Sequence, residues 1–302
     1  MGLALGVGLA FLRERLDDRL RGRGDLEARA GAPVLAVVPH ASSWKKRKEA
    51  RLVTVTEPRS APSEAYRTLR TSLLFTASQK GVRKVVITSS QDEEGKTTTV
   101  ANLGMVLAQA GKRVVLVDAD LRKPRLHRFF GVENRVGLTN VLAEEVQPPE
   151  AVVQSGVPNL VLLPCGPVPG NPAELLSSDA MGAMLQHLGK IADFVVVDSA
   201  PVLAAADASI LATYADAVLM VADADRATRG SVAHARVQLD QVNANVVGAV
   251  LNNFDLSKAR AYPYYYQYYY VYRYEQPDGG RRTRGAERAE PGSPEQRRMW
   301  SS

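Results

Sequence analysis

A chain of 302 residues is long enough for one α/β domain of about 200 residues with flanking segments. Its hydrophobic content of 45% and charged content of 23% are ordinary for a globular protein with a substantial core. The single cysteine, Cys165, excludes an internal disulfide and any multi-thiolate metal site within one subunit. The net charge of +6 comes largely from short local runs, so no nucleic-acid-binding domain is expected.

The chain starts with an apolar, uncharged segment, residues 1–12, and a charged stretch comes directly after it. Twelve helical residues rise about 18 Å, too little to span a hydrocarbon core of about 30 Å. Two interpretations stay open: the inner end of a membrane helix that starts upstream, or an apolar N-terminal helix of a peripheral protein. The positive charge just after the apolar run would place the remainder of the chain in the cytoplasm, at the inner face of a membrane.

Residues 13–56 read as a juxtamembrane linker with one small structured piece, a proline-boxed apolar run at 33–39. From about Glu57 to residue 256, short valine-rich runs alternate with helical patterns. This alternation predicts an α/β fold with a mostly parallel central sheet flanked by helices. The tail 257–302 is expected to be disordered. We expect strands near 83–89, 113–118, 159–163, 193–198, 216–222 and 246–252.

The strongest motif is an apolar strand that runs into a loop ending in Gly95-Lys96-Thr97, where a helix opens at once. A P-loop has this context: backbone N–H groups cradle phosphates at a helix N-terminus, the lysine reaches the β- and γ-phosphates, and the threonine hydroxyl binds Mg²⁺. Ser90 replaces the first glycine of the motif. The residues expected to contact ATP are Ser90, Gln91, Asp92, Glu93, Glu94, Gly95, Lys96, Thr97, Thr98 and, at the end of the last strand, Asn252.

Three carboxylates come at the ends of two further buried strands. Asp118 and Asp120 end one strand, and Asp198 ends the other, so all three should lie at the carboxyl edge of the sheet, where open α/β folds bind ligands. Carboxylates that converge beside a P-loop would repel one another, and a Mg²⁺ ion between them is the simplest account.

Together, these motifs resemble the Walker A, A′ and B motifs of the bacterial tyrosine kinases. These are the capsule and exopolysaccharide kinases built on a P-loop ATPase scaffold. The resemblance covers roughly residues 57–274, and 8–14 is similar to the segment after the last membrane helix of a fused polysaccharide co-polymerase. It implies an ATP- and Mg²⁺-dependent protein-tyrosine kinase. Asp92 and Glu93 depart from the family, because many members have Pro-Gly there, and they add negative charge beside the phosphates.

The resemblance also implies roles for the charged residues of the site. The catalytic set would be Lys96, Asp118, Asp120 and Asp198. Thr97, Asp120 and Asp198 would organise Mg²⁺ directly or through water, and Asp118 would accept or orient the tyrosine hydroxyl proton. Positioning and charge neutralisation carry most of phosphoryl transfer, so Lys96 and the metal should matter more than the base.

Two more segments match the family. A Glu-x-x-Arg-x-x-Arg pattern, formed by Glu64, Arg67 and Arg70, lies opposite an apolar helix face, and members use it for subunit contacts in a ring. Nine of the 11 tyrosines lie within residues 262–274, where the family carries its autophosphorylation sites. The expected phosphorylated residues are Tyr262, Tyr264, Tyr265, Tyr266, Tyr268, Tyr269, Tyr270, Tyr272 and Tyr274.

We therefore predict an autophosphorylating tyrosine kinase that regulates capsular or exopolysaccharide synthesis and export. Its expected partners are an activating membrane co-polymerase, other copies of itself, a tyrosine phosphatase and the membrane surface, with no nucleic acid. Two alternatives stay open: an ATPase switch of the ParA/MinD type, and a non-catalytic ATP-binding regulator of an export complex. ParA/MinD proteins place a lysine after the first P-loop glycine, where this chain has Gln91.

Overall fold

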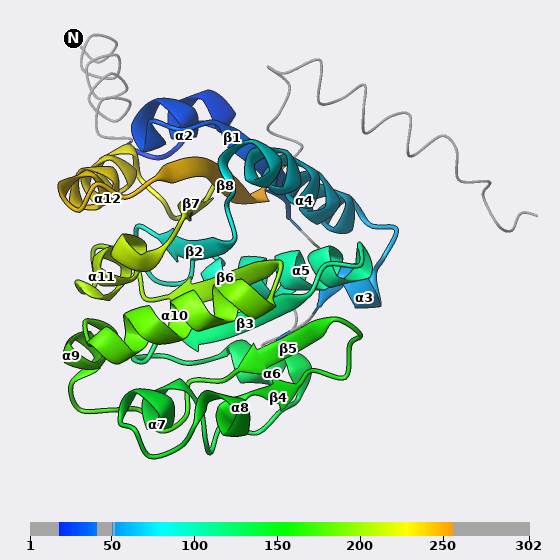
Figure 1. Cartoon of the computed structure of the whole chain (residues 1–302). Helices are drawn as coiled ribbons and strands as arrows, with labels where there is room; N and C mark the ends of the chain where they lie inside the picture. The colour runs from blue at the N-terminus through cyan, green and yellow to red at the C-terminus, as the bar shows by residue number, and fades with distance from the viewer. Residues whose placement is uncertain (1–17, 41–49, 51, 256–302) are drawn as a thin grey trace, which may run out of the picture. The chain divides into compact units, whose positions relative to one another are not determined.

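The computed structural model describes residues 18–40, 50 and 52–255. Within them, eight strands form one sheet in the order β1-β8-β7-β2-β6-β3-β5-β4 (Figure 1). All neighbouring strands are parallel except β4 and β5. The strands are β1 (Val34–Pro39), β2 (Lys84–Ser89), β3 (Val114–Ala119), β4 (Val153–Gln154), β5 (Leu160–Leu163), β6 (Phe194–Ser199), β7 (Ala217–Asp223) and β8 (Val246–Phe254).

The six strands expected from the sequence are confirmed, each ending within two residues of its expected position. They are valine-rich because both faces of the sheet are buried. Successive side chains point to opposite faces, so Val86 packs into one core cluster while Val85 and Ile87 pack into the other.

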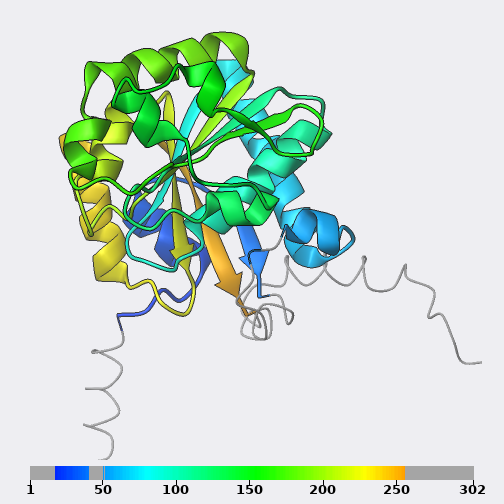
Figure 2. The ribbon, with the colours of Figure 1, turned by 90° about the horizontal axis from the view of Figure 1, so that it is seen from below.

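Helices cover both faces of the sheet (Figures 1 and 2). One core cluster includes buried residues of α2, α10, α11 and α12, and the other includes buried residues of α3, α4 and α5. The longer helices are α2 (Arg23–Ala30), α4 (Ala61–Lys80), α5 (Lys96–Gln109), α10 (Asp179–Ile191), α11 (Asp207–Tyr214) and α12 (Arg229–Gln241). The short ones are α3 (Val53–Thr56), α6 (Leu126–Phe130), α7 (Leu138–Leu142), α8 (Pro148–Ala151) and α9 (Pro172–Leu176).

The sheet begins at Val34, inside the segment 13–56 that the sequence predicts as a linker. The proline-boxed run forms β1, which pairs in parallel with β8 and adds an edge strand to the main sheet. The structured part therefore starts before residue 57, where we expected the domain to begin. The apolar segment 1–12 and the tail 257–302 lie outside the described residues.

The strands that carry the motifs end at the same edge of the sheet. β2 leads into the loop before α5, and β6 lies between β2 and β3, with Asp118 of β3 in register with Asp198 of β6. Ligands of open α/β sheets bind at this carboxyl edge, where the strand order reverses. Among the described residues, no helix has the length and apolar character to cross a membrane.

Candidate functional site

The loop between β2 and α5 has P-loop geometry. β2 ends at Ser89, α5 begins at Lys96, and Gly95 takes φ 95°, a left-handed conformation that glycine adopts without strain. A Cβ atom on Gly95 would lie 2.0 Å from Nδ2 of Asn252, so a side chain there would also clash with β8. Backbone conformation and close packing therefore both require the glycine of the Gly-Lys-Thr motif.

Lys96 is the first residue of α5, at the carboxyl edge of the sheet. Its side chain is nearly buried at the start of α5, at 6% exposure. Its positive charge acts to lower the pKa of the carboxyls of Asp92, Glu94 and Asp198. Thr97 and Thr98 come next on the first turn of α5 and are half-buried. The lysine is thus placed where it can neutralise an anion bound at the helix N-terminus.

Asp118 and Asp198 form a buried pair of carboxylates on neighbouring strands. Burial raises the pKa of both groups, and the charge of Asp118 raises that of Asp198 further. Asp118 Oδ2 accepts a hydrogen bond from the Leu126 amide at 3.0 Å. Asp118 Oδ1 and both carboxylate oxygens of Asp198 are buried and have no hydrogen-bond partner among the described residues.

Buried carboxylate oxygens without partners are costly, and a divalent cation removes that cost. Thr97, Asp120 and Asp198, the residues predicted to organise Mg²⁺, all lie at this edge of the sheet. No cluster of three or more His, Cys, Asp or Glu side chains in the described ranges is arranged as a metal cage. Mg²⁺ usually takes one or two carboxylates and completes its shell with waters and substrate phosphates, so the unpartnered oxygens fit such an ion.

The loop after β3 is held by its own charges. Asp120 Oδ1 accepts a hydrogen bond from the Lys123 amide at 3.0 Å. The Arg122 guanidinium makes two hydrogen bonds, of 2.8 and 3.0 Å, to the buried carboxylate of Asp207 at the start of α11. His127 Nδ1 lies 4.0 Å from Asp118 Oδ2. Arg122 therefore ties the loop to α11, a contact that the local sequence pattern did not indicate.

Asp92 and Glu93 are each paired with a cation from another loop. Lys123 Nζ lies 2.5 Å from Asp92 Oδ2. Arg226, which lies in the turn between β7 and α12, forms an ion pair with Glu93. Lys123 lowers the pKa of the Asp92 carboxyl. The negative charge of Asp92 and Glu93 is therefore largely balanced by two cations that are distant in sequence.

Ser90, Gln91 and Glu94 bond to one another inside the loop. The Glu94 carboxylate accepts hydrogen bonds from the Ser90 amide at 2.9 Å and the Gln91 amide at 3.2 Å. Asn252 Nδ2 donates to the Glu94 carbonyl at 3.1 Å, and Asn252 Oδ1 is buried without a partner among the described residues. Asn252 therefore supports the loop, and its predicted contact with adenine stays a prediction.

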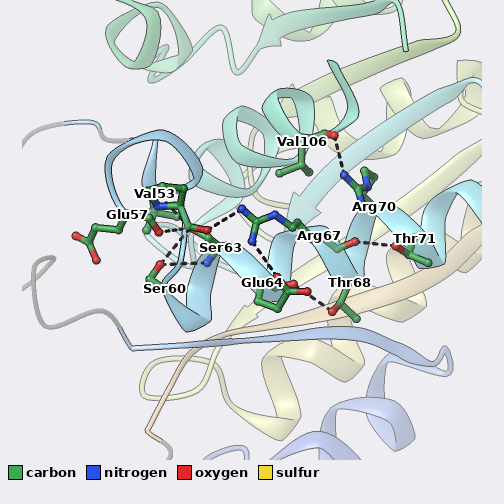
Figure 3. Close-up of polar contacts among 11 residues, drawn as sticks. Val53, Glu57, Ser60, Ser63, Glu64, Arg67, Thr68, Arg70, Thr71 and Val106 are labelled. Carbon is green, nitrogen blue, oxygen red and sulfur yellow. Dashed lines mark hydrogen bonds and ion pairs between the residues drawn. The ribbon is translucent and has the colours of Figure 1, made fainter. Parts of the chain in front are cut away.

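The expected apolar face of α4 is confirmed, because Tyr66, Leu69 and Leu73 are fully buried. The charged residues of the same helix bond within the chain (Figure 3). Arg67 donates to Glu64 at 2.8 Å and to the Pro58 carbonyl at 2.7 Å. Arg70 donates to the Val106 carbonyl of α5 at 3.4 Å. These contacts order the side chains that we predicted to meet another subunit, and that subunit contact stays a prediction.

Comparisons with known proteins agree with this geometry. Residues 82–247 match the family model described as an AAA domain. The chain is 42% identical over 219 residues to the tyrosine-protein kinase YwqD of Bacillus subtilis, covering 72% of this chain and 92% of YwqD. It is 36% identical to the putative tyrosine-protein kinase EpsB of Ralstonia solanacearum, covering 84% of this chain and 35% of EpsB. Among solved structures, the kinase domain of the Escherichia coli tyrosine kinase ETK superimposes with a TM-score of 0.73 at 32% identity, covering 76% of this chain and 93% of that one.

Proposed function

This chain belongs to the family of bacterial tyrosine-protein kinases, and we propose that it transfers the γ-phosphoryl group of ATP to tyrosines of its own C-terminal segment. The observation that carries the proposal is the pair of buried carboxylates, Asp118 and Asp198, whose unpartnered oxygens lie at the same sheet edge as Lys96. A site that must hold a metal and a polyphosphate needs this combination of anions and a cation at a helix N-terminus.

The residues of the P-loop bind and orient ATP. Lys96 and the amides at the start of α5 hold the phosphates, and the lysine neutralises charge that builds up during transfer. Thr97, Asp120 and Asp198 would hold Mg²⁺, which neutralises the phosphates and aligns them when bound. Lys96, Asp120 and Asp198 are buried, so water screens their charges less than it screens charges at the surface.

Asp118 is the group that receives the tyrosine hydroxyl proton. Its Oδ2 is fixed by the Leu126 amide, which leaves Oδ1 for the substrate. Burial raises the pKa of this carboxyl, and a higher pKa makes it a stronger proton acceptor than an exposed aspartate. Phosphoryl transfer needs alignment more than proton removal, so this role contributes less than that of Lys96.

The substrate tyrosines lie in residues 262–274, beyond the described residues. β8 ends at Phe254, at the carboxyl edge of the sheet, which also carries the P-loop. Autophosphorylation of a neighbouring copy would require subunits to assemble. Glu64, Arg67 and Arg70 on α4 are the contacts we propose for a ring.

The setting is the cytoplasmic face of a bacterial cell membrane, in control of capsular or exopolysaccharide synthesis and export. The chain spans 35% of the length of EpsB. In that larger relative, the region similar to this chain is therefore part of a longer polypeptide. A membrane co-polymerase would activate the kinase, and a tyrosine phosphatase would reverse its action. The apolar segment 1–12 and the basic residues 45–48 are the parts that would approach the membrane.

The test is incubation of the full chain with labelled ATP and Mg²⁺, then mapping of the modified residues. Label should appear within 262–274. The Lys96→Met variant should lose labelling while its melting temperature stays near that of the wild type. Wild-type protein that hydrolyses ATP and labels no tyrosine would favour the ATPase-switch alternative. Wild-type protein that binds ATP without turnover would favour the non-catalytic regulator.

A further inference from the structure

A chain of hydrogen bonds links the P-loop to the N-terminus of α12. Besides the amides of Ser90 and Gln91, the Glu94 carboxylate accepts the Ser90 hydroxyl, at 2.9 Å to one oxygen and 3.1 Å to the other. The Ser90 hydroxyl oxygen also lies 3.1 Å from the Ser231 hydroxyl oxygen of α12. Ser231 is 141 residues away in sequence and belongs to none of the nucleotide-binding motifs.

Each serine has a single hydroxyl proton, and this fixes the direction of the linked hydrogen bonds. When Glu94 is ionised, its carboxylate is the strongest acceptor for the single hydroxyl proton of Ser90, so that proton points to Glu94. The bond between the two serines must then be donated by Ser231. Ser231 in turn accepts the Thr228 amide proton at 3.1 Å and can share its own proton with the Thr228 carbonyl at 3.0 Å. The bonds therefore run from the start of α12 through two hydroxyls to the carboxylate.

Burial makes each of these bonds hard to replace. Ser90, Glu94 and Ser231 are all buried, so water cannot readily take the place of a missing hydroxyl. A buried polar group that loses its partner carries the full cost of its desolvation. The conformation of the loop therefore depends on Ser231 more strongly than it would if the contact were exposed to water.

Ser231 is itself rigidly held. It occupies the third position of α12 and forms a capping box with Thr228, whose hydroxyl accepts the Ser231 amide proton at 3.0 Å. Val232, Ala235 and Leu239 anchor the helix in the core. The start of α12 therefore holds the Ser231 hydroxyl in place beside Ser90.

We propose that Ser231 is a positioning residue for the nucleotide: through Ser90 and the Glu94 carboxylate, its hydroxyl fixes the loop backbone that receives the phosphates. Ser231 acts only through other residues and does not touch the nucleotide. Glu94 directly precedes Gly95 and Lys96, so a shift of its backbone moves the groups that bind phosphate. The proposal rests on the proposed nucleotide-binding function of this loop.

The experiment measures ATP affinity by calorimetry, and kcat and KM for ATP, in the full chain. Ser231→Ala should weaken ATP binding by about five- to tenfold, as expected for one buried hydrogen bond, and raise KM more than it lowers kcat. Ser231→Thr keeps the hydroxyl and should stay within about twofold of the wild type. Ser178→Ala is the matched control, because Ser178 caps α10 through the Met181 amide and does not contact the P-loop.

A double-mutant cycle tests the route. If Ser231 acts through Ser90, adding Ser231→Ala to Ser90→Ala should weaken ATP binding little further. Additive losses would overturn the route through Ser90. Wild-type affinity in Ser231→Ala, or an equal loss in Ser178→Ala, would overturn the positioning role. These readouts concern binding, so a wild-type chain that binds ATP and labels no tyrosine would refute the kinase proposal alone.

Discussion

Three consecutive carboxylates in the P-loop have different environments. Asp92 and Glu93 are exposed and form ion pairs with Lys123 and Arg226. Glu94 is fully buried and accepts hydrogen bonds from the loop itself. Exposed ion pairs contribute little because water and salt screen them, whereas a buried carboxylate affects both stability and loop shape. Adjacent residues of the same charge therefore contribute unequally to stability and loop shape, and the buried one contributes most.

The largest effect expected from this difference is a pH dependence of stability that Glu94 causes. Burial raises the pKa of its carboxyl from 4.5 to about 7, although the amides of Gln91 and Ser90 and the charge of Lys96 lower it. Between these two values the folded chain holds a proton that the unfolded chain has lost, so stability falls as pH rises. The contribution, about 3 kcal/mol, is complete below pH 4.5 and is lost by about pH 7.

The measurement is the free energy of unfolding by denaturant at several pH values, for the wild type and Glu94→Gln. Glutamine has nearly the same shape and does not titrate, so the variant should show a flatter curve between pH 4.5 and 7. Asp118 and Asp198 contribute in the same direction and are present in both proteins, so the difference isolates Glu94. Parallel curves would show that this carboxyl titrates as an exposed one does.

Removing the Glu94 side chain should lower the free energy of unfolding by somewhat less than this pH effect. In Glu94→Ala the buried amide of Ser90 and the part-buried amide of Gln91 lose their acceptor. We expect the free energy of unfolding to fall by about 2 kcal/mol at pH 6, together with weaker ATP binding. Asp92→Ala, with an exposed carboxylate two positions earlier, is the control and should change both quantities far less. Equal effects of the two alanines would break the distinction between buried and exposed carboxylates.

The sequence predicted the elements of the fold better than their long-range contacts. Valine-rich runs and the P-loop motif are local patterns, so the six strands and the loop between β2 and α5 were placed correctly. β1 was expected in a linker because its pairing with β8 joins segments about 200 residues apart, which no local pattern reports. The same holds for Ser231 beside Ser90 and for Arg226 beside Glu93. The extra negative charge was visible in the sequence, and its compensation was not.

Glu93 offers a smaller test, of backbone strain rather than charge. Its φ of 61° lies in the left-handed region, which costs a residue with a side chain about 1 kcal/mol and costs glycine almost nothing. Glu93→Gly should therefore stabilise the fold by up to about 1 kcal/mol, less the small contribution of the exposed pair with Arg226. Denaturant unfolding of Glu93→Gly and Glu93→Gln separates the two, since only the glycine relieves strain. A Gln variant as stable as the Gly variant would assign the gain to charge removal.

The smallest expected effect belongs to the pair of Asp92 and Lys123, and it shows whether this exposed contact matters for ATP binding at all. Lys123→Glu would place two carboxylates opposite each other beside the phosphates, and KM for ATP should rise a few-fold at low salt. Exchanging the two charges, in Asp92→Lys with Lys123→Glu, restores the pair and should bring KM within about twofold of the wild type. The Lys123 amide still donates to Asp120 in every variant, because that bond involves only the backbone of residue 123.

A salt series tests whether the effect is electrostatic. At 1 M salt the screening length is about 3 Å, so the KM values of Lys123→Glu and of the exchanged protein, each divided by the KM of the wild type at the same salt, should both approach one. If the exchanged protein is as impaired as Lys123→Glu alone, the lysine acts on the nucleotide directly and its pairing with Asp92 is incidental.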